Sequence, residues 1–229
     1  MIPPKIDPVY LLGTFDPAKD SLFVRIQDQH SAGSGRGAFL HQEAYEAFVR
    51  MHDAAKADGI SLIIKSATRN FYRQKAIWEA KWTGARRVGG KNLAQSVADP
   101  AERAKTILRY SSMPGTSRHH WGTDMDLNAF ENDYFKSGRG LAEYEWLVAH
   151  AAEFGFGQPY TAKGPERPNG YEEERWHWSY LPVAKSYLAA YRADISPAMI
   201  KGFKGAEVAE SLDVIQNYVF GIHPNCKDQ

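Results

Sequence analysis

The chain has 229 residues, which is enough to bury one sizeable hydrophobic core. Its 28 basic and 27 acidic residues give a formal net charge of +1, so we expect no nucleic-acid partner and no broad charged surface for an anionic membrane. The single cysteine, Cys226, excludes an internal disulfide framework and paired-cysteine zinc sites. Any bound metal would therefore need nitrogen and oxygen ligands.

The sequence carries no visible signal for export or membrane insertion. No apolar run reaches the length of a transmembrane helix. The N-terminal stretch "MIPPKIDPVYLLG" lacks the charged start, apolar stretch and small-residue cleavage site of a secretion signal. The chain would be either cytoplasmic or an exported protein whose signal has been removed, and composition does not decide between the two.

The first half of the chain combines loops, helices and one buried strand. Apolar residues at helical spacing predict the helices, and a run rich in β-branched residues predicts the strand. In chain order, we expect a surface loop at 31–37, a helix at 41–58 that ends at Gly59, a strand at 60–68, and helices at 70–82 and 99–110.

The second half begins with a helix predicted at 140–154, whose apolar face would carry Leu141, Tyr144, Val148 and Ala151. It continues with a Pro- and Gly-rich loop at 158–171, a helix at 182–193 and a tail at 194–229. A loop of this kind either shapes a cleft or simply connects two elements.

Helices and short strands are mixed without a regular strand–helix–strand alternation, which favours an α+β fold. We expect one catalytic domain over residues 1–229. Its motif-bearing core would cover about 40–193, and a helical tail would cover 194–229.

The segment "SRHHWGTDMDL", residues 117–127, combines histidines with carboxylates. Its last four residues alternate between polar and apolar, as in a half-buried strand, so Asp124 and Asp126 would share one face. His119 and His120 precede a turn and would point to different sides, so at most one of them can join the carboxylates. The alternation does not rank one aspartate above the other as a metal ligand.

A second segment, "EEERWHWSY", places His177 between two tryptophans. A strand would turn both tryptophans to one face, with His177 and Ser179 on the other. A buried core histidine beside a solvated acidic run explains this pattern equally well. If the site is catalytic, strand alternation favours Glu173 as the nearby base, and Glu174 would serve only if the chain turns just before the strand.

Hydrolytic zinc sites hold the ion with three protein ligands and use a further carboxylate to carry the proton. The sequence lacks the HExxH helix of common metalloproteases. Its ligands would therefore have to come from separated segments.

Three motifs carry a resemblance to a known family. "SRHHWGTDMD" resembles the Ser-x-His-x-x-Gly-x-Ala-x-Asp motif of the LAS metallopeptidases, named after lysostaphin, the D-alanyl-D-alanine metallopeptidases and sonic hedgehog. "ERWH" is similar to the second family motif, Glu-x-x-His. "SATRNFYRQ", residues 66–74, is similar to the Tyr-Arg-Ser-x-x-x-Gln region of the D,D-carboxypeptidase branch that includes the vancomycin-resistance enzymes. The resemblance implies a hedgehog/D,D-peptidase-like α+β domain, with a small antiparallel sheet flanked by helices.

The resemblance also implies a set of metal ligands and a base. It makes His119, Asp126 and His177 the ligands of one Zn²⁺ ion. It makes Glu174 the general base, and so decides against Glu173, which strand alternation favoured.

Four further residues would contact the substrate or support the site. Arg69 matches the family arginine that contacts substrate and stabilises the oxyanion, a role suited to a permanently charged donor. Ser117 matches the motif serine and Gln74 the motif glutamine, both expected to bind substrate or line the site. Arg73 is a candidate cation for the free carboxylate of a substrate.

The sequence departs from the family pattern at several positions. Asp124 stands where the family has alanine, and would either orient a ligand or compete for the metal. His120 would neighbour the site without binding the ion. Thr68 and Asn70 replace the tyrosine and serine that flank the family arginine.

The resemblance implies a zinc-dependent D,D-carboxypeptidase that removes C-terminal D-alanine from peptidoglycan stem peptides in the bacterial envelope or periplasm. An L,D-carboxypeptidase acting on tetrapeptide stems and a cell-wall endopeptidase are the alternatives within the family. A non-catalytic zinc or cell-wall-binding module is the alternative from another class, although the presence of both Glu174 and Arg69 argues against it. We expect a monomer without a membrane span.

Overall fold

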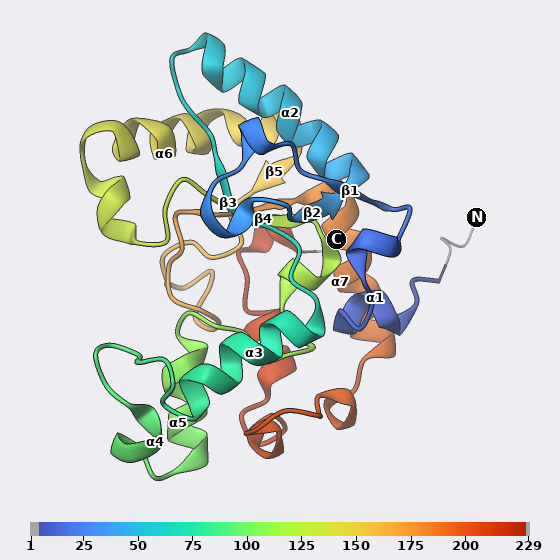
Figure 1. The fold of residues 1–229 in the computed structure, drawn as a ribbon, viewed down its shortest axis with the longest axis vertical. Helices are drawn as coiled ribbons and strands as arrows, with labels where there is room; N and C mark the ends of the chain where they lie inside the picture. The colour runs from blue at the N-terminus through green and yellow to red at the C-terminus, as the bar shows by residue number, and fades with distance from the viewer. Residues whose placement is uncertain (1–4, 228–229) are drawn as a thin grey trace.

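The computed structural model describes residues 5–227, in which helices and short strands are mixed (Figure 1). The α-helices are α1 (Pro8–Leu12), α2 (Gln42–Ala57), α3 (Phe71–Trp82), α4 (Leu93–Ser96), α5 (Pro100–Leu108), α6 (Gly138–His150) and α7 (Leu181–Asp194). The strands are β1 (Phe23–Arg25), β2 (Phe39–His41), β3 (Ile64–Ser66), β4 (Asp124–Leu127), β5 (Phe156–Gly157) and β6 (His177–Tyr180).

The strands form two small antiparallel sheets. The first pairs β1 with β2, and the second has the order β3-β4-β6-β5. In the second sheet, Asp126 on the inner strand β4 lies opposite Ser66 on β3 and opposite His177 on β6. This register brings polar side chains from three separated segments into one row across the sheet. The predicted α+β fold with a small antiparallel sheet is confirmed.

Two hydrophobic clusters hold the sheet and helices together. One cluster packs α2 and α6 against one face of the sheet, where Met125 and Leu127 of β4 are fully buried. The other cluster joins α3, α5 and α7 with the C-terminal segment. Figure 1 shows α2 and α6 above the sheet and α3, α4 and α5 below it. Burying each large apolar side chain contributes about 1.5–3 kcal/mol, so these clusters fix the sheet between the two groups of helices.

Helix α3 begins directly after the segment that carries Arg69. The Asn70 side chain caps the helix by accepting a hydrogen bond from the Arg73 backbone N–H, at 3.0 Å. Asparagine is among the best N-cap residues. Asn70, at a position where the family has serine, therefore starts the helix at a defined residue.

The structure differs from the sequence-based expectations in several places. The strand predicted at 60–68 is shorter, because only Ile64–Ser66 pairs with β4. Strand β4 is buried on both faces rather than half-buried, and Arg118 and His177 form hydrogen bonds to Asp124 on its polar face. The buried face of α6 carries Trp146 and Leu147, whereas Val148 is 60% exposed.

The segment after α7 packs against the helices as turns of 3₁₀ and π helix, rather than as the predicted helical tail. Val219 is fully buried in the cluster, and the Trp78 indole N–H of α3 donates to the Lys204 carbonyl at 2.8 Å. The predicted domain bounds stay a prediction. Among the described residues, no helix has the length and apolar character needed to cross a membrane.

Candidate active site

Two histidines and one aspartate converge at the polar face of the sheet. His119 comes from the 3₁₀ turn before β4, Asp126 from β4 and His177 from the start of β6. One potential ligand atom from each side chain lies within 4.8 Å of the other two, and all three residues are buried. Asp126 Oδ1 is 3.4 Å from His119 Nε2 and 3.2 Å from His177 Nδ1, yet accepts no hydrogen bond within the described part of the chain. A buried carboxylate oxygen between two imidazole nitrogens suits a cation, and this donor set suits zinc.

Hydrogen bonds outside the cluster orient both imidazole rings. His119 Nδ1 lies 2.9 Å from the Ala67 carbonyl, which can only accept, so the proton is on Nδ1 and Nε2 is left as an acceptor. His177 Nε2 lies 2.8 Å from Asp124 Oδ2, which leaves Nδ1 facing Asp126. This outer hydrogen bonding is the usual way in which proteins select the metal-binding nitrogen.

The charges around the two rings also suit a cation. Burial, together with the Arg69 guanidinium, lowers the pKa of His119 to about 4, so its imidazole is neutral at pH 7. Burial opposes protonation of His177 as well, but Asp124, Asp126 and Glu174 raise its pKa well above the usual value. A positive charge is therefore favoured among these carboxylates, and a bound metal ion would supply it.

Asp124 is fully buried and uses both carboxylate oxygens in hydrogen bonds. Oδ2 accepts from His177 Nε2 and from Arg118 Nε, each at 2.8 Å. Oδ1 accepts from the hydroxyls of Ser179 and Thr123, each at 2.7 Å. Although burial alone would raise it, Arg118 and His177 hold the pKa of Asp124 below its usual range. Asp124 thus contacts the outer side of the His177 ring and does not face the cation position.

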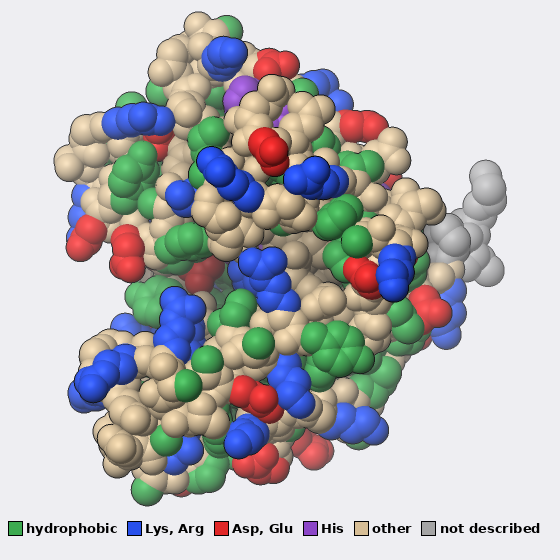
Figure 2. Space-filling model, in the orientation of Figure 1, with side chains coloured by type: hydrophobic (Ala, Val, Ile, Leu, Met, Phe, Trp, Pro, Cys, Tyr) green, Lys and Arg blue, Asp and Glu red, His purple; other side chains and the backbone are tan. Residues whose placement is uncertain are grey.

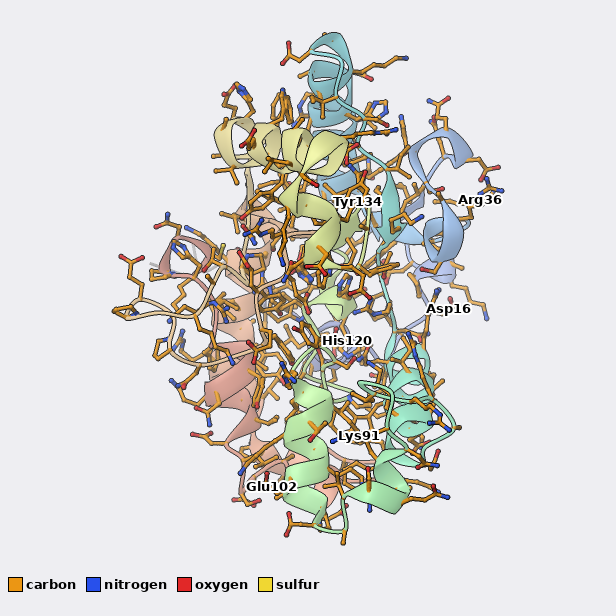
Figure 3. The ribbon with its side chains drawn as sticks, turned by 90° about the vertical axis from the view of Figure 1, so that its left-hand side faces the viewer. Asp16, Arg36, Lys91, Glu102, His120 and Tyr134 are labelled. Carbon is orange, nitrogen blue, oxygen red and sulfur yellow. The ribbon has the colours of Figure 1, made fainter. Side chains whose placement is uncertain are left out.

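His120 lies apart from the cluster, near the middle of the molecule (Figure 3). Its Nδ1 contacts the backbone carbonyl of Arg69, and its Nε2 accepts from the Gly115 N–H at 3.0 Å. Both histidines lie in the 3₁₀ turn Arg118–Trp121, which ends at Gly122 with φ +71°. Of the two adjacent histidines, His119 lies beside Asp126, whereas His120 contacts the Arg69 carbonyl.

Glu174 stands beside the cluster because the chain turns just before β6. The His177 backbone N–H donates to the Glu174 carbonyl at 3.2 Å, and Glu174 Oε2 lies 3.4 Å from His177 Nδ1. Burial raises the pKa of the Glu174 carboxyl. Glu173 instead pairs with Arg175 at 3.3 Å and does not line the cavity. From the sequence, Glu174 could face the site only if the chain turned just before the strand, and the structure has this turn.

Arg69 is held at the edge of the cluster by three side chains. Its Nη1 donates to the Ser66 hydroxyl at 2.7 Å and lies 3.4 Å from Asp126 Oδ2. Its Nε donates to Gln74 Oε1 at 3.1 Å, and Gln74 itself is almost fully buried. The guanidinium therefore has a fixed position next to Asp126, with Gln74 as its support.

These residues lie at the floor of a cavity of about 770 Å³. Figure 2 shows the corresponding hollow between the upper and lower parts of the molecule, with Lys and Arg side chains along its edge. Ser117 and Arg73 both line it, and the buried Ser117 hydroxyl has no hydrogen-bond partner in residues 5–227. All the predicted catalytic, metal-binding and substrate-binding residues therefore border one cavity.

Several lining residues were not found by sequence reasoning. Tyr160 and Tyr171 come from the ends of the Pro- and Gly-rich loop, so this loop shapes the cavity. Phe130 and its neighbours in the segment after β4 also line it. Lys81 lies seven residues after Gln74 on α3, and this two-turn spacing was the only signal that could have placed it on the same face.

An antiparallel sheet that bears a buried His-Asp-His cluster, with a further carboxylate beside it, is the architecture of a metallopeptidase-type domain. Residues 37–183 match the VanY family of D-alanyl-D-alanine carboxypeptidases, and the chain belongs to that family.

Two curated relatives support this assignment. The chain is 33% identical over 149 residues to the Bacillus subtilis (strain 168) protein YodJ, a match that covers 62% of this chain and 46% of YodJ. It is 32% identical over 133 residues to a D-alanyl-D-alanine carboxypeptidase of Enterococcus faecalis (strain ATCC 700802 / V583), covering 58% of this chain and 45% of the relative. The matched regions span less than half the length of these two relatives.

Solved structures show the same fold. The LdcB LD-carboxypeptidase aligns with a TM-score of 0.53 and 24% identity, covering 88% of this chain and 78% of that chain. A variant of a VanY D,D-pentapeptidase from a VanB-type vancomycin-resistance cassette, solved in complex with Zn(II), aligns with a TM-score of 0.50 and 25% identity. That match covers 74% of this chain and 89% of the pentapeptidase chain.

Proposed function

We propose that this protein is a zinc-dependent D,D-carboxypeptidase that removes C-terminal D-alanine from peptidoglycan stem peptides in the bacterial cell envelope. The observation that carries the proposal is the His119, Asp126 and His177 cluster at the floor of the cavity, with Glu174 beside it. Membership of the VanY family and the relatives that act on D-alanyl-D-alanine support the substrate class.

His119, Asp126 and His177 would hold the ion through Nε2, Oδ1 and Nδ1, the atoms that face one another in the cluster. When bound, zinc lowers the pKa of water and polarises the carbonyl to be cleaved. The Ala67 carbonyl and the Asp124 carboxylate would keep the two imidazole rings in the orientation that exposes these nitrogens.

Glu174 would take the proton from the attacking water and return it to the leaving amine. Its carboxylate is close to the cluster without belonging to it, as this role requires. Because burial raises the pKa of Glu174, its protonated form is easier to reach during turnover than that of an exposed glutamate.

Arg69 would donate hydrogen bonds to the negative charge that develops on the carbonyl oxygen. Its guanidinium is preorganised by Ser66 and Gln74, so little reorientation is needed during the reaction. Ser117 and Arg73 would contact the substrate, with the free Ser117 hydroxyl facing the cavity.

The test is to incubate zinc-loaded protein with pentapeptide and tetrapeptide stems and to measure released D-alanine. We expect release from the pentapeptide. Release from the tetrapeptide alone would indicate an L,D-carboxypeptidase, and no release from either would favour an endopeptidase or a binding module.

Two variants separate catalysis from metal binding. Glu174→Ala should abolish turnover and retain one zinc ion per chain, whereas Glu173→Ala removes the neighbouring glutamate and should keep activity. Full activity after removal of metal with a chelator would refute the zinc mechanism.

A further inference from the structure

Lys81 extends the row of functional side chains along α3. Gln74, Ile77 and Lys81 follow at helical spacing, and all three line the cavity. Gln74 supports Arg69 at the metal end of this row. Two helical turns, about 10 Å, separate Gln74 from Lys81 along the helix axis. The lysine therefore lines the same cavity two helical turns beyond Gln74.

The Lys81 ammonium forms no ion pair within residues 5–227. No carboxylate lies within ion-pair distance of it there, and its one side-chain hydrogen bond goes to the Ser111 hydroxyl, which also lines the cavity. Lys75, on the same helix, differs in both respects. Its Nζ lies 3.7 Å from Glu79 and donates to the Gly202 carbonyl at 2.5 Å, and it does not line the cavity.

The surroundings of Lys81 make its charge costly. Burial, followed by the Arg86 and Arg69 guanidiniums, lowers the pKa of Lys81 to about 8, while Glu174 acts in the opposite direction. A partly desolvated cation without a partner destabilises a fold, and such groups in cavities commonly mark a position where a ligand supplies the opposite charge.

We propose that Lys81, with the Ser111 hydroxyl, binds a carboxylate of the peptide substrate. The proposal rests on the proposed function and assigns a specificity role to a residue outside the family motifs quoted above. An extended peptide covers about 3.3–3.6 Å per residue, so a carboxylate bound at Lys81 would lie within a few residues of the cleaved bond. It would be either the C-terminal carboxylate of the leaving residue or a carboxylate of the stem on the other side of that bond.

Two peptide pairs distinguish these sources. The first is acetyl-L-Lys-D-Ala-D-Ala with a free C-terminal carboxylate, compared with its terminal amide. The second is the pentapeptide L-Ala-γ-D-Glu-L-Lys-D-Ala-D-Ala with the D-Glu α-carboxylate free, compared with its amidated form. Dissociation constants are measured by calorimetry on zinc-loaded Glu174→Ala protein, which cannot turn the peptides over, with and without Lys81→Met.

We expect Lys81→Met to weaken binding of the carboxylate form at least tenfold and to remove the preference for it over the amide in one of the two pairs. That pair identifies the carboxylate. Lys81→Arg should retain the preference, because it retains the charge. Lys75→Met, the matched lysine on α3, should leave all four dissociation constants unchanged.

Two results would overturn the proposal. The protein could bind both members of each pair equally well, or Lys81→Met could weaken the carboxylate and amide forms to the same extent in both pairs, as a structural defect would. Turnover of the pentapeptide by the protein with Glu174 intact is measured in parallel. Absence of D-alanine release refutes the proposed function itself, whereas normal release with no effect of Lys81→Met refutes only the assignment of Lys81.

Discussion

Asp124 is the position at which this chain departs from the family motif, and Asp124→Ala restores the family alanine. The substitution removes an acceptor of four hydrogen bonds from a fully buried position. It leaves the Arg118 guanidinium buried without its counter-charge and the His177 Nε2 without its acceptor. Both the stability of the protein and its affinity for zinc should therefore fall.

The two effects have different magnitudes. Removal of one partner from a buried ion pair costs about 3–5 kcal/mol of unfolding free energy. Loss of the hydrogen bond that orients a metal-ligating histidine typically lowers metal affinity about 10–100-fold. Urea denaturation of the metal-free protein measures the first effect, and competition with a chromophoric zinc chelator measures the second.

A double variant separates the two roles of Asp124. In Asp124→Ala/Arg118→Met both buried charges are gone, so most of the lost stability should return. Zinc affinity should stay low, because His177 still lacks its acceptor. Asp53→Ala removes an exposed aspartate beside His52 and serves as the control that should change neither quantity.

The reasoning would be refuted if the double variant were stable and bound zinc as tightly as the unmodified protein. Asp124 would then compensate the charge of Arg118 without orienting His177.

Three further predictions follow from buried groups and from backbone geometry. The pKa of Lys81 is lowered from 10.5 to about 8 in the folded protein. The charged lysine therefore destabilises the fold fully below pH 8, and this loss of unfolding free energy disappears as the pH rises from 8 to 10.5. Lys81→Met should therefore raise the unfolding free energy by up to about 3 kcal/mol at pH 7 and by much less near pH 10, as judged by urea denaturation; a less stable variant at pH 7 would contradict this. Burial raises the pKa of the Cys226 thiol to about 11, so a thiol reagent at pH 8 should label it only after denaturation, and rapid labelling of the native protein would argue against that burial. Gly122→Ala should lower both the stability and the zinc content of the protein, because a Cβ at this φ of +71° would lie 2.3 Å from a ring carbon of Phe23. Thermal unfolding and metal analysis measure the two quantities, and an unchanged value of both would contradict the prediction.

Local patterns in the sequence were sufficient to predict most of the helices and to place the two aspartates of β4 on one face of that strand. Helical periodicity predicted α2, α3, α5 and α7 within two residues of their observed ends. Strand alternation placed Asp124 and Asp126 on one face, and both contact His177. Each of these features depends on residues that are close together in the chain, which is why a short window contains the information.

The buried face of α6 could not be predicted from the local sequence pattern. Periodicity identified a helix but assigned Val148 to its buried face, and the tertiary packing buries Trp146 and Leu147 instead. Which face of a helix is covered depends on the direction from which its neighbours approach. Here those neighbours include α2 and the sheet, which are distant in the chain.

For the site, spacing indicated that one histidine and at least one aspartate could meet, and the family resemblance named His119 and Asp126. The tertiary structure decided the rest. The pairing of Asp126 with His177, more than 50 residues later, determines which atoms face one another. A turn before β6 brings Glu174 to the cavity in place of Glu173.

The same long-range contacts determine the surroundings of two charged residues that sequence reasoning did not resolve. Asp124 could have been a ligand until His177 Nε2 and Arg118 were found to occupy its oxygens. For Lys81 the only signal in the sequence was its spacing on α3. The fold places its side chain in the cavity, where it forms no ion pair among residues 5–227. Periodicity predicts which residues share a face of one helix or strand. Which residues pack against that face depends on the register of the sheet and the packing of the helices, and these are properties of the whole chain.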